Sequence, residues 1–150
     1  MAQPSPETPQ PPAVPSPVPT ISTHVLDVER GRPAVGVHVS LYKLGEDDRP
    51  IRLTQALTDG DGRVRDLLER PMSPGVYRLE FDLLGPRGAR TGAAPGMASG
   101  AASGAAPGAA ARDESFFRRV AIDVLVDDVS RSYHVPLLLA PYAMTTYRGS

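Results

Sequence analysis

The chain has 150 residues and a formal net charge of −1, so it lacks the basic excess that attracts nucleic acids or acidic membranes. It contains no cysteine, which excludes disulfides, thiolate metal sites and a cysteine nucleophile. No run approaches the roughly 20 apolar residues of a membrane helix, and the N-terminus lacks the pattern of a secretory signal, so we expect a cytoplasmic protein that binds neither membranes nor nucleic acids.

The first 19 residues are predicted to form a disordered leader. Eight of the 17 prolines fall in this segment, and proline-rich tracts adopt extended conformations without internal hydrogen bonds. The sequence therefore predicts one domain over residues 20–150, with the leader at 1–19 outside it.

The first half of this domain alternates apolar and polar residues, as half-buried strands do. Strands are predicted at Ile21–Val28, Val35–Tyr42 and Ile51–Leu57. A tight turn is predicted at Asp59–Gly62, because its glycines can adopt positive φ. Residues Val64–Arg70 could form either a strand or a single helical turn.

The second half contains further strand patterns on both sides of a low-complexity insert. Strands are predicted at Val76–Leu84, Phe116–Val126 and Arg131–Leu139. Between them, at about 89–111, glycine recurs every fourth residue among Ala, Pro and Ser. This tract has too few large apolar side chains to offset the entropy of ordering it, so we predict a flexible insert. Seven or eight short strands with almost no helical period predict an all-β sandwich.

The chain has three histidines. His38 is in phase with the polar residues of its strand and is predicted to face solvent. His24 and His134 lie in predicted strands, where each is either a hydrogen-bonded structural residue or part of a functional cleft. A two-histidine metal site is the weaker alternative, because no third ligand has suitable spacing. Arg63, directly after the Asp-Gly turn, would ordinarily be a surface charge.

The chain ends in Tyr-Arg-Gly-Ser, Tyr147–Ser150. This segment combines a phenol, a guanidinium, a flexible glycine and a hydroxyl with the terminal carboxylate. It is either a frayed tail, as chain ends often are, or a positioned segment that recognises a small planar polar molecule. These four residues alone leave both interpretations open.

Four segments together resemble the 5-hydroxyisourate hydrolases of the transthyretin-like protein family. They are Ser22–Asp27, Asp59–Arg63, Tyr133–Leu139 and Tyr147–Ser150, in that order along the chain. The resemblance implies a transthyretin-like (prealbumin) β-sandwich of two four-stranded sheets with at most one short helix. It also implies a homotetramer with active sites at a dimer–dimer interface. The helix would fall near Leu83–Ala89, where the glycine-rich insert makes its presence doubtful.

The resemblance further implies hydrolysis of 5-hydroxyisourate to 2-oxo-4-hydroxy-4-carboxy-5-ureidoimidazoline in purine breakdown, with neither a metal nor an organic cofactor. The residues that would act in catalysis are His24, Arg63, His134 and Ser150. The residues that would bind substrate are His24, Arg63, Tyr147, Arg148 and Gly149. We expect the histidines to handle the proton of an attacking water and the arginine to pair with substrate oxygens, with either histidine able to serve as the base.

Two alternatives to an enzyme are open, because a fold alone does not determine a function. The first is a non-catalytic carrier of small molecules, as transthyretin is on this fold. The second is a structural sandwich module displayed by the proline-rich leader. Neither alternative requires the histidines, the arginine and the terminal tetrapeptide together.

Overall fold

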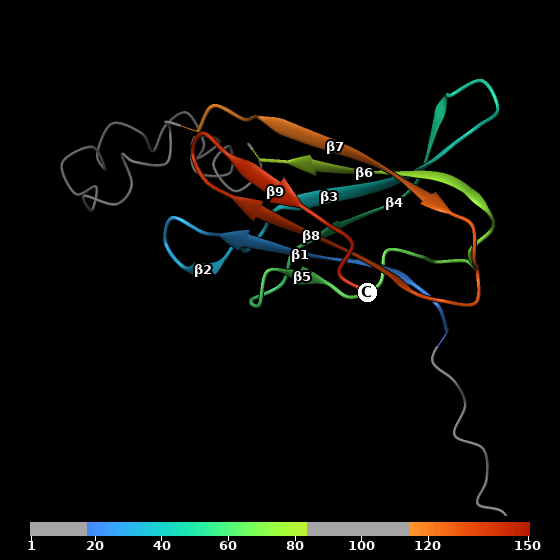
Figure 1. The fold of residues 1–150 in the computed structure, drawn as a ribbon, viewed down its shortest axis with the longest axis horizontal. Coiled ribbons are helices and arrows are strands. Elements are labelled where there is room, and N and C mark those ends of the chain that lie inside the picture. Colours follow the sequence, from blue (N-terminus) through green and yellow to red (C-terminus); the bar gives the residue numbers. More distant parts are fainter. Residues whose placement is uncertain (1–17, 84–114) are drawn as a thin grey trace, which may run out of the picture.

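The computed structural model describes residues 18–83 and 115–150, and these residues form strands and no helix (Figure 1). The strands are β1 (Ile21–Asp27), β2 (Arg32–Pro33), β3 (His38–Leu44), β4 (Pro50–Leu57), β5 (Arg63–Val64), β6 (Gly75–Asp82), β7 (Arg119–Val126), β8 (Tyr133–Leu139) and β9 (Met144–Thr146). The all-β sandwich expected from the sequence is confirmed.

The strands form two sheets that pack face to face. Sheet A has the order β2-β1-β8-β9, with β5 also paired to β1, and sheet B has the order β4-β3-β6-β7. All pairs are antiparallel except β1 and β8, which run parallel in the middle of sheet A. Strands from the two ends of the domain thus lie side by side (Figure 1).

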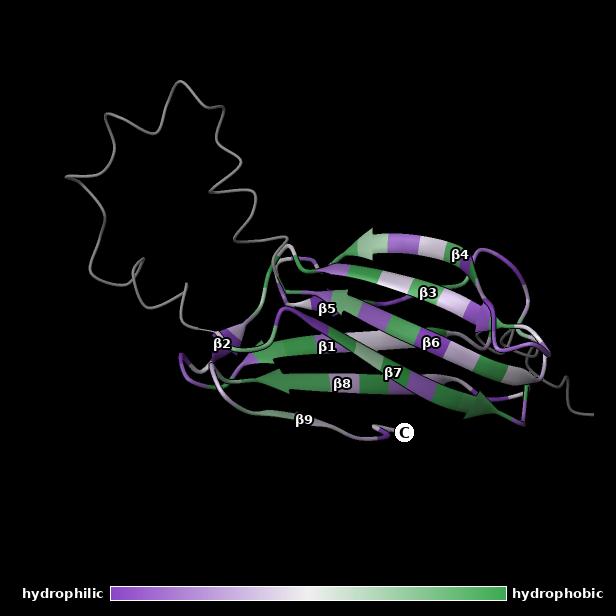
Figure 2. Cartoon of the chain, turned by 90° about the horizontal axis from the view of Figure 1, so that it is seen from above, coloured by the Kyte–Doolittle hydropathy of each residue, from purple (hydrophilic) through white to green (hydrophobic). Residues whose placement is uncertain are grey.

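Apolar and polar residues alternate along most strands, so that alternate apolar side chains point into the space between the two sheets. Hydrophilic and hydrophobic residues alternate along β3 and β6, whereas β8 is largely hydrophobic (Figure 2). Val39, Leu41, Leu79 and Phe81 of sheet B and Val25 and Leu137 of sheet A are fully buried. Each such side chain contributes about 1.5–3 kcal/mol relative to its exposed state, so this core holds the central β1–β8 pair in place.

Several local details differ from the sequence expectations. Of the segment Val64–Arg70, only Val64 lies in a strand, as the last residue of β5. Sheet A has five strands rather than four, because the two-residue strands β2 and β5 both pair with β1. The third strand begins at His38 rather than Val35, because Gly36 adopts a φ of 75° just before it. The apolar side chains of β4 are exposed, as this strand forms an edge of sheet B.

Parts of the predicted domain organisation lie outside the described residues. These parts are the leader at 1–19 except for its last two residues, and the whole insert at about 89–111. The position suggested for a short helix, Leu83–Ala89, is likewise outside except for Leu83. Among the described residues, no helix is long and apolar enough to cross a membrane.

Candidate active site

Three neighbouring strands of sheet A bring His24, Arg63 and His134 together. His24 of β1 is paired with Arg63 of β5, and Ser22 of β1 is paired with His134 of β8. Paired residues and residues two apart along a strand point to the same side of a sheet. Since the intervening Thr23 is buried in the core, these side chains all lie on the outer face of sheet A. The parallel pairing of β1 with β8 therefore produces a convergence that spacing in the sequence could not show.

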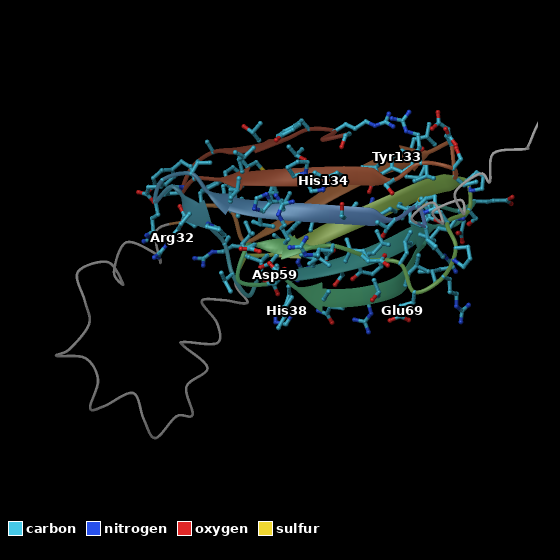
Figure 3. The ribbon with its side chains drawn as sticks, turned by 90° about the horizontal axis from the view of Figure 1, so that it is seen from below. Arg32, His38, Asp59, Glu69, Tyr133 and His134 are labelled. Carbon is cyan, nitrogen blue, oxygen red and sulfur yellow. The ribbon has the colours of Figure 1, made fainter. Side chains whose placement is uncertain are left out.

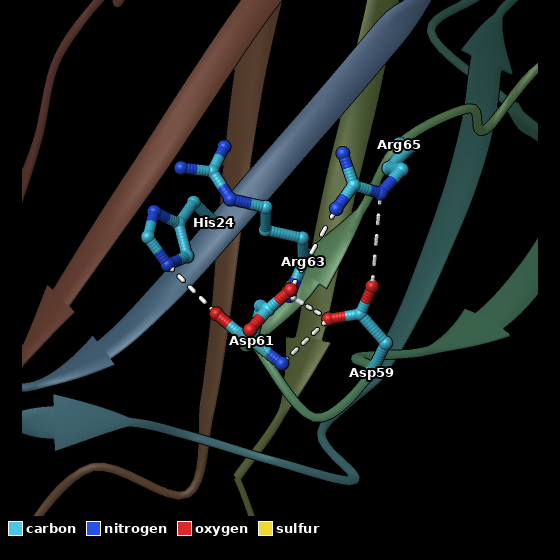
Figure 4. A network of polar contacts seen from close by, with 5 residues as sticks. All are labelled: His24, Asp59, Asp61, Arg63 and Arg65. Atoms are coloured by element: carbon cyan, nitrogen blue, oxygen red, sulfur yellow. Dashed lines mark hydrogen bonds and ion pairs between the residues drawn. The ribbon is translucent and has the colours of Figure 1, made fainter.

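The turn before β5 is built to deliver Arg63 beside β1. The Asp59 carboxylate accepts hydrogen bonds from the backbone N–H groups of Asp61, at 2.9 Å, and Arg63, at 3.0 Å (Figure 4). The pKa of Asp59 lies below its usual value, and the largest cause is the hydrogen bond from the backbone N–H of Arg63. Gly62 adopts a φ of 74°, and an added Cβ would lie only 2.4 Å from the carbonyl oxygen of Val25. Glycine is thus required where the turn presses against β1.

His24 is anchored by the same turn. Its Nε2 lies 2.8 Å from the carbonyl oxygen of Asp61 (Figure 4). A carbonyl oxygen can only accept a hydrogen bond, so Nε2 carries the proton, and Nδ1 is the free acceptor of the neutral ring. The loop that positions Arg63 therefore also sets the orientation and tautomer of His24.

His134 is partly buried and lies close to the positive charge of Arg63. Partial burial, first, then the positive charge of Arg63, and last the charge that His24 carries when it is protonated, lower the pKa of His134 below its ordinary value. Each of these disfavours the imidazolium form. Its Nδ1 lies 2.8 Å from the Ser22 hydroxyl oxygen. A lowered pKa keeps the His134 imidazole neutral near neutral pH, as a general base must be.

The terminal segment returns alongside β8 and covers His134. The backbone N–H of Gly149 donates a hydrogen bond of 2.8 Å to the carbonyl oxygen of His134. A Cβ added at Gly149 would lie 2.5 Å from Cδ2 of the imidazole, closer than real Cβ contacts allow. The chain end is thus positioned, and its glycine lets the backbone lie against the ring.

Arg148 and Tyr147 precede Gly149 and lie near His134 and Tyr133. The Arg148 guanidinium is 5.0 Å from the centre of the Tyr133 ring, a cation–π arrangement. Both residues border a crevice of about 300 Å³ that is lined by Ile122, Val124, Leu125, Tyr133, His134, Val135, Thr146, Tyr147 and Arg148. Ser150 is exposed, next to Gly149. Gly149 therefore lies directly against the His134 ring, and Tyr147 and Arg148 line this crevice together with His134.

The sequence did not single out Ser22 or the Asp61 carbonyl, which are the hydrogen-bond partners of the two histidines. Ser22 falls within one of the segments that carry the family resemblance, but its meaning depends on the β1–β8 register. His38 lies on β3 in the other sheet, partly exposed and away from the cluster, as Figure 3 shows. Among residues 18–83 and 115–150, no group of three or more His, Cys, Asp or Glu side chains is placed to hold a metal ion.

A two-sheet sandwich with a parallel central pair and a His-Arg-His cluster on the outer face of one sheet defines a transthyretin-like protein with a candidate catalytic site. Residues 21–149 match the HIUase/Transthyretin family, and the chain belongs to this family. It is 37% identical over 134 residues to the 5-hydroxyisourate hydrolase of Deinococcus radiodurans, covering 88% of this chain and 97% of that protein.

The chain is also similar to solved structures, among them the following two. The 5-hydroxyisourate hydrolase of Klebsiella pneumoniae is 34% identical, with a TM-score of 0.61, and the match covers 87% of this chain and 99% of that one. Sea bream transthyretin in complex with thyroxine has a TM-score of 0.64 and covers 85% of this chain and 92% of its own. Its identity is only 22%, so this second likeness shows the fold alone.

Proposed function

We propose that this protein hydrolyses 5-hydroxyisourate to 2-oxo-4-hydroxy-4-carboxy-5-ureidoimidazoline, a step of urate breakdown. The observation that carries the proposal is the convergence of His24, Arg63 and His134 on one face of sheet A. This set supplies a neutral imidazole, a second imidazole of fixed tautomer and a guanidinium. Relatives that share about a third of the sequence over nearly their whole length bear the name of this activity.

In the proposed mechanism His134 is the general base. Nε2 of His134 accepts a proton from water while the water oxygen bonds to the amide carbon of the substrate ring. The carbon–nitrogen bond then breaks, and the same proton passes to the departing nitrogen. Arg63 donates hydrogen bonds to the carbonyl oxygen as its negative charge develops. His24, whose Nε2 is bound to the turn, uses Nδ1 to accept a hydrogen bond from the substrate or the water.

The chain end is proposed to complete the substrate site. Tyr147 and Arg148 would hold the flat ring by hydrogen bonds, and Gly149 would border it. Ser150 and its carboxylate would fix the terminal segment or a water molecule. The support for this part is the hydrogen bond that ties Gly149 to the backbone of His134.

A homotetramer in the cytoplasm is part of the proposal. β7 and β9 are the edge strands on one side of the sandwich, and unpaired edges are commonly protected by assembly. Large apolar side chains near these strands are 55–73% exposed in the protomer, namely Phe116, Leu125, Tyr142 and Tyr147. Assembly through these edges would bury that surface and bring Tyr147 and Arg148 close to a second copy.

The function is tested by generating 5-hydroxyisourate from urate with a urate oxidase and following its decay by ultraviolet absorbance. We expect a large acceleration over spontaneous hydrolysis, and sedimentation of the same sample at the mass of a tetramer. A tetramer that binds the compound without accelerating its decay would favour the carrier alternative. A monomer without activity would favour the structural module.

Replacing Gly149 with Ala is expected to reduce kcat/KM for 5-hydroxyisourate at least about tenfold, because small misplacements of a catalytic group are costly. The new Cβ would force the His134 ring or the terminal segment to move. Gly45→Ala, in the loop between β3 and β4, is the control, since the nearest atom to a Cβ added there belongs to the flexible side chain of Asp47. Turnover of Gly149→Ala equal to that of Gly45→Ala would show that the terminal segment does not position His134.

A further inference from the structure

The hydroxyl of Ser22 on β1 lies within hydrogen-bond distance of the His134 ring. Ser22 and His134 are direct partners in the parallel β1–β8 pair, and both side chains point to the outer face of sheet A. The Ser22 oxygen lies 2.8 Å from Nδ1 of His134. Gly149 covers the Cδ2 side of the same ring. The imidazole is therefore restrained from two directions by segments that are far apart in the sequence.

These restraints leave Nε2 as the reactive nitrogen. Within residues 18–83 and 115–150, no hydrogen bond engages Nε2 of His134. A neutral imidazole has one protonated and one unprotonated nitrogen. If Nδ1–H donates to the Ser22 oxygen, the lone pair lies on Nε2 and can accept a proton from water. Without a partner at Nδ1, both tautomers would be populated and the ring could turn about its side-chain bonds.

A hydroxyl suits this position better than a carboxylate would. A carboxylate beside Nδ1 would stabilise the imidazolium and raise the pKa of His134, whereas a neutral acceptor selects the tautomer without adding charge. Partial burial, first, and then the positive charge of Arg63 act in the opposite sense to a carboxylate and lower the pKa of His134. Ser22 thus completes a set of contacts that keeps the ring neutral and oriented.

We propose that Ser22 is a positioning residue for the hydrolysis: its hydroxyl oxygen accepts a hydrogen bond from Nδ1–H of His134 and thereby presents Nε2 to the attacking water. The proposal rests on the proposed function, because it assigns His134 the role of base. Because the hydrogen bond from His134 to Ser22 sets the orientation and tautomer of the imidazole, its loss should lower kcat and leave substrate binding largely intact.

The test compares Ser22→Ala with Ser22→Thr, which keeps a hydroxyl at the same position. Ser22→Ala should lower kcat about 10- to 100-fold, as is typical when a partner that orients a working side chain is removed, with KM within about threefold of wild type. Ser22→Thr should recover most of the loss. Ser40→Ala on β3 is the matched control for removing a strand hydroxyl in the other sheet, and it should retain wild-type kcat.

Nitrogen-15 NMR of the imidazole gives a readout that does not depend on turnover. Wild type and Ser22→Thr should show His134 predominantly protonated at Nδ1, and Ser22→Ala should show a mixture of both tautomers. The proposal is overturned if Ser22→Ala leaves both kcat and the tautomer unchanged, or if both Ser22 variants lose activity equally. An inactive wild type in which Nδ1 is protonated would reject the hydrolase function while retaining the contact, so the two failures are distinguishable.

Discussion

Replacing His134 with Asn is expected to lower kcat/KM for 5-hydroxyisourate by about 100- to 10,000-fold, the usual contribution of a positioned general base. The shorter Asn side chain can still reach toward Ser22 with its amide but has no group in place of Nε2. The variant should therefore fold normally and lose only the proton acceptor. The measurement is the ultraviolet decay assay at several substrate concentrations, with melting temperature and oligomeric state as checks on the fold.

His38→Asn provides the matched control for this loss. His38 is also a strand histidine on the outer face of its sheet, but it belongs to β3 in sheet B (Figure 3). We expect its kcat/KM to stay within about twofold of wild type, as for a surface substitution away from the site. If His134→Asn remained as active as His38→Asn, His134 would not be the base, and His24 would become the candidate.

The sequence predicted the strands because their residues follow the two-residue period that sheet geometry imposes. It placed β1, β6 and β8 close to their observed bounds, since each carries an apolar row that the core buries. It was less accurate where the chain departs from regular pairing, as at Gly36 before β3 and in the two-residue strand β5. Those details depend on local backbone geometry and on which strand is the neighbour.

The sequence identified most residues of the candidate site but not their arrangement, because the arrangement depends on the register of the paired strands. His24, Arg63 and His134 were named from the family resemblance, but their proximity follows from β1 lying between β5 and β8. The role of Ser22 emerges only from the parallel register that sets it opposite His134. The two histidines also could not be ranked as bases from sequence, because their burial and neighbouring charges are tertiary properties.

The same cluster explains how a transthyretin-like fold can support catalysis. The core between the sheets needs only the inward rows of apolar residues, so the outward rows are free to vary without loss of the fold. In this chain the outward positions of β1, β5 and β8 carry imidazoles, a guanidinium and a hydroxyl. The glycine of the chain end then closes against one imidazole. The candidate site therefore lies on a face whose side chains are not part of the apolar core between the sheets.

Arg63 is expected to have two separable effects on the reaction. Arg63→Ala should reduce kcat about 100- to 1,000-fold, because it removes the donor to the developing oxyanion. It should also shift the pH dependence. The pKa of His134 is lowered by burial and then by the positive charge of Arg63, so the wild-type kcat/KM should remain high until the pH falls below the ordinary histidine value of about 6.5.

The direction of the shift follows from the charge that is lost. Without the cation at position 63 the imidazolium of His134 is less disfavoured, its pKa rises, and the neutral base is depleted at a higher pH. The acid limb of the Arg63→Ala profile should thus move toward neutrality. Arg63→Lys retains the charge without the planar fork of donors, so it should keep the wild-type acid limb while losing part of kcat.

Arg52→Ala, at an exposed position of β4 in sheet B, is the control for removing an arginine. It should change neither kcat nor the pH profile. An Arg63→Ala profile that is lower but not shifted would mean that Arg63 acts on the substrate and not on His134. A shifted profile with undiminished kcat at high pH would mean that Arg63 acts on His134 and not on the substrate.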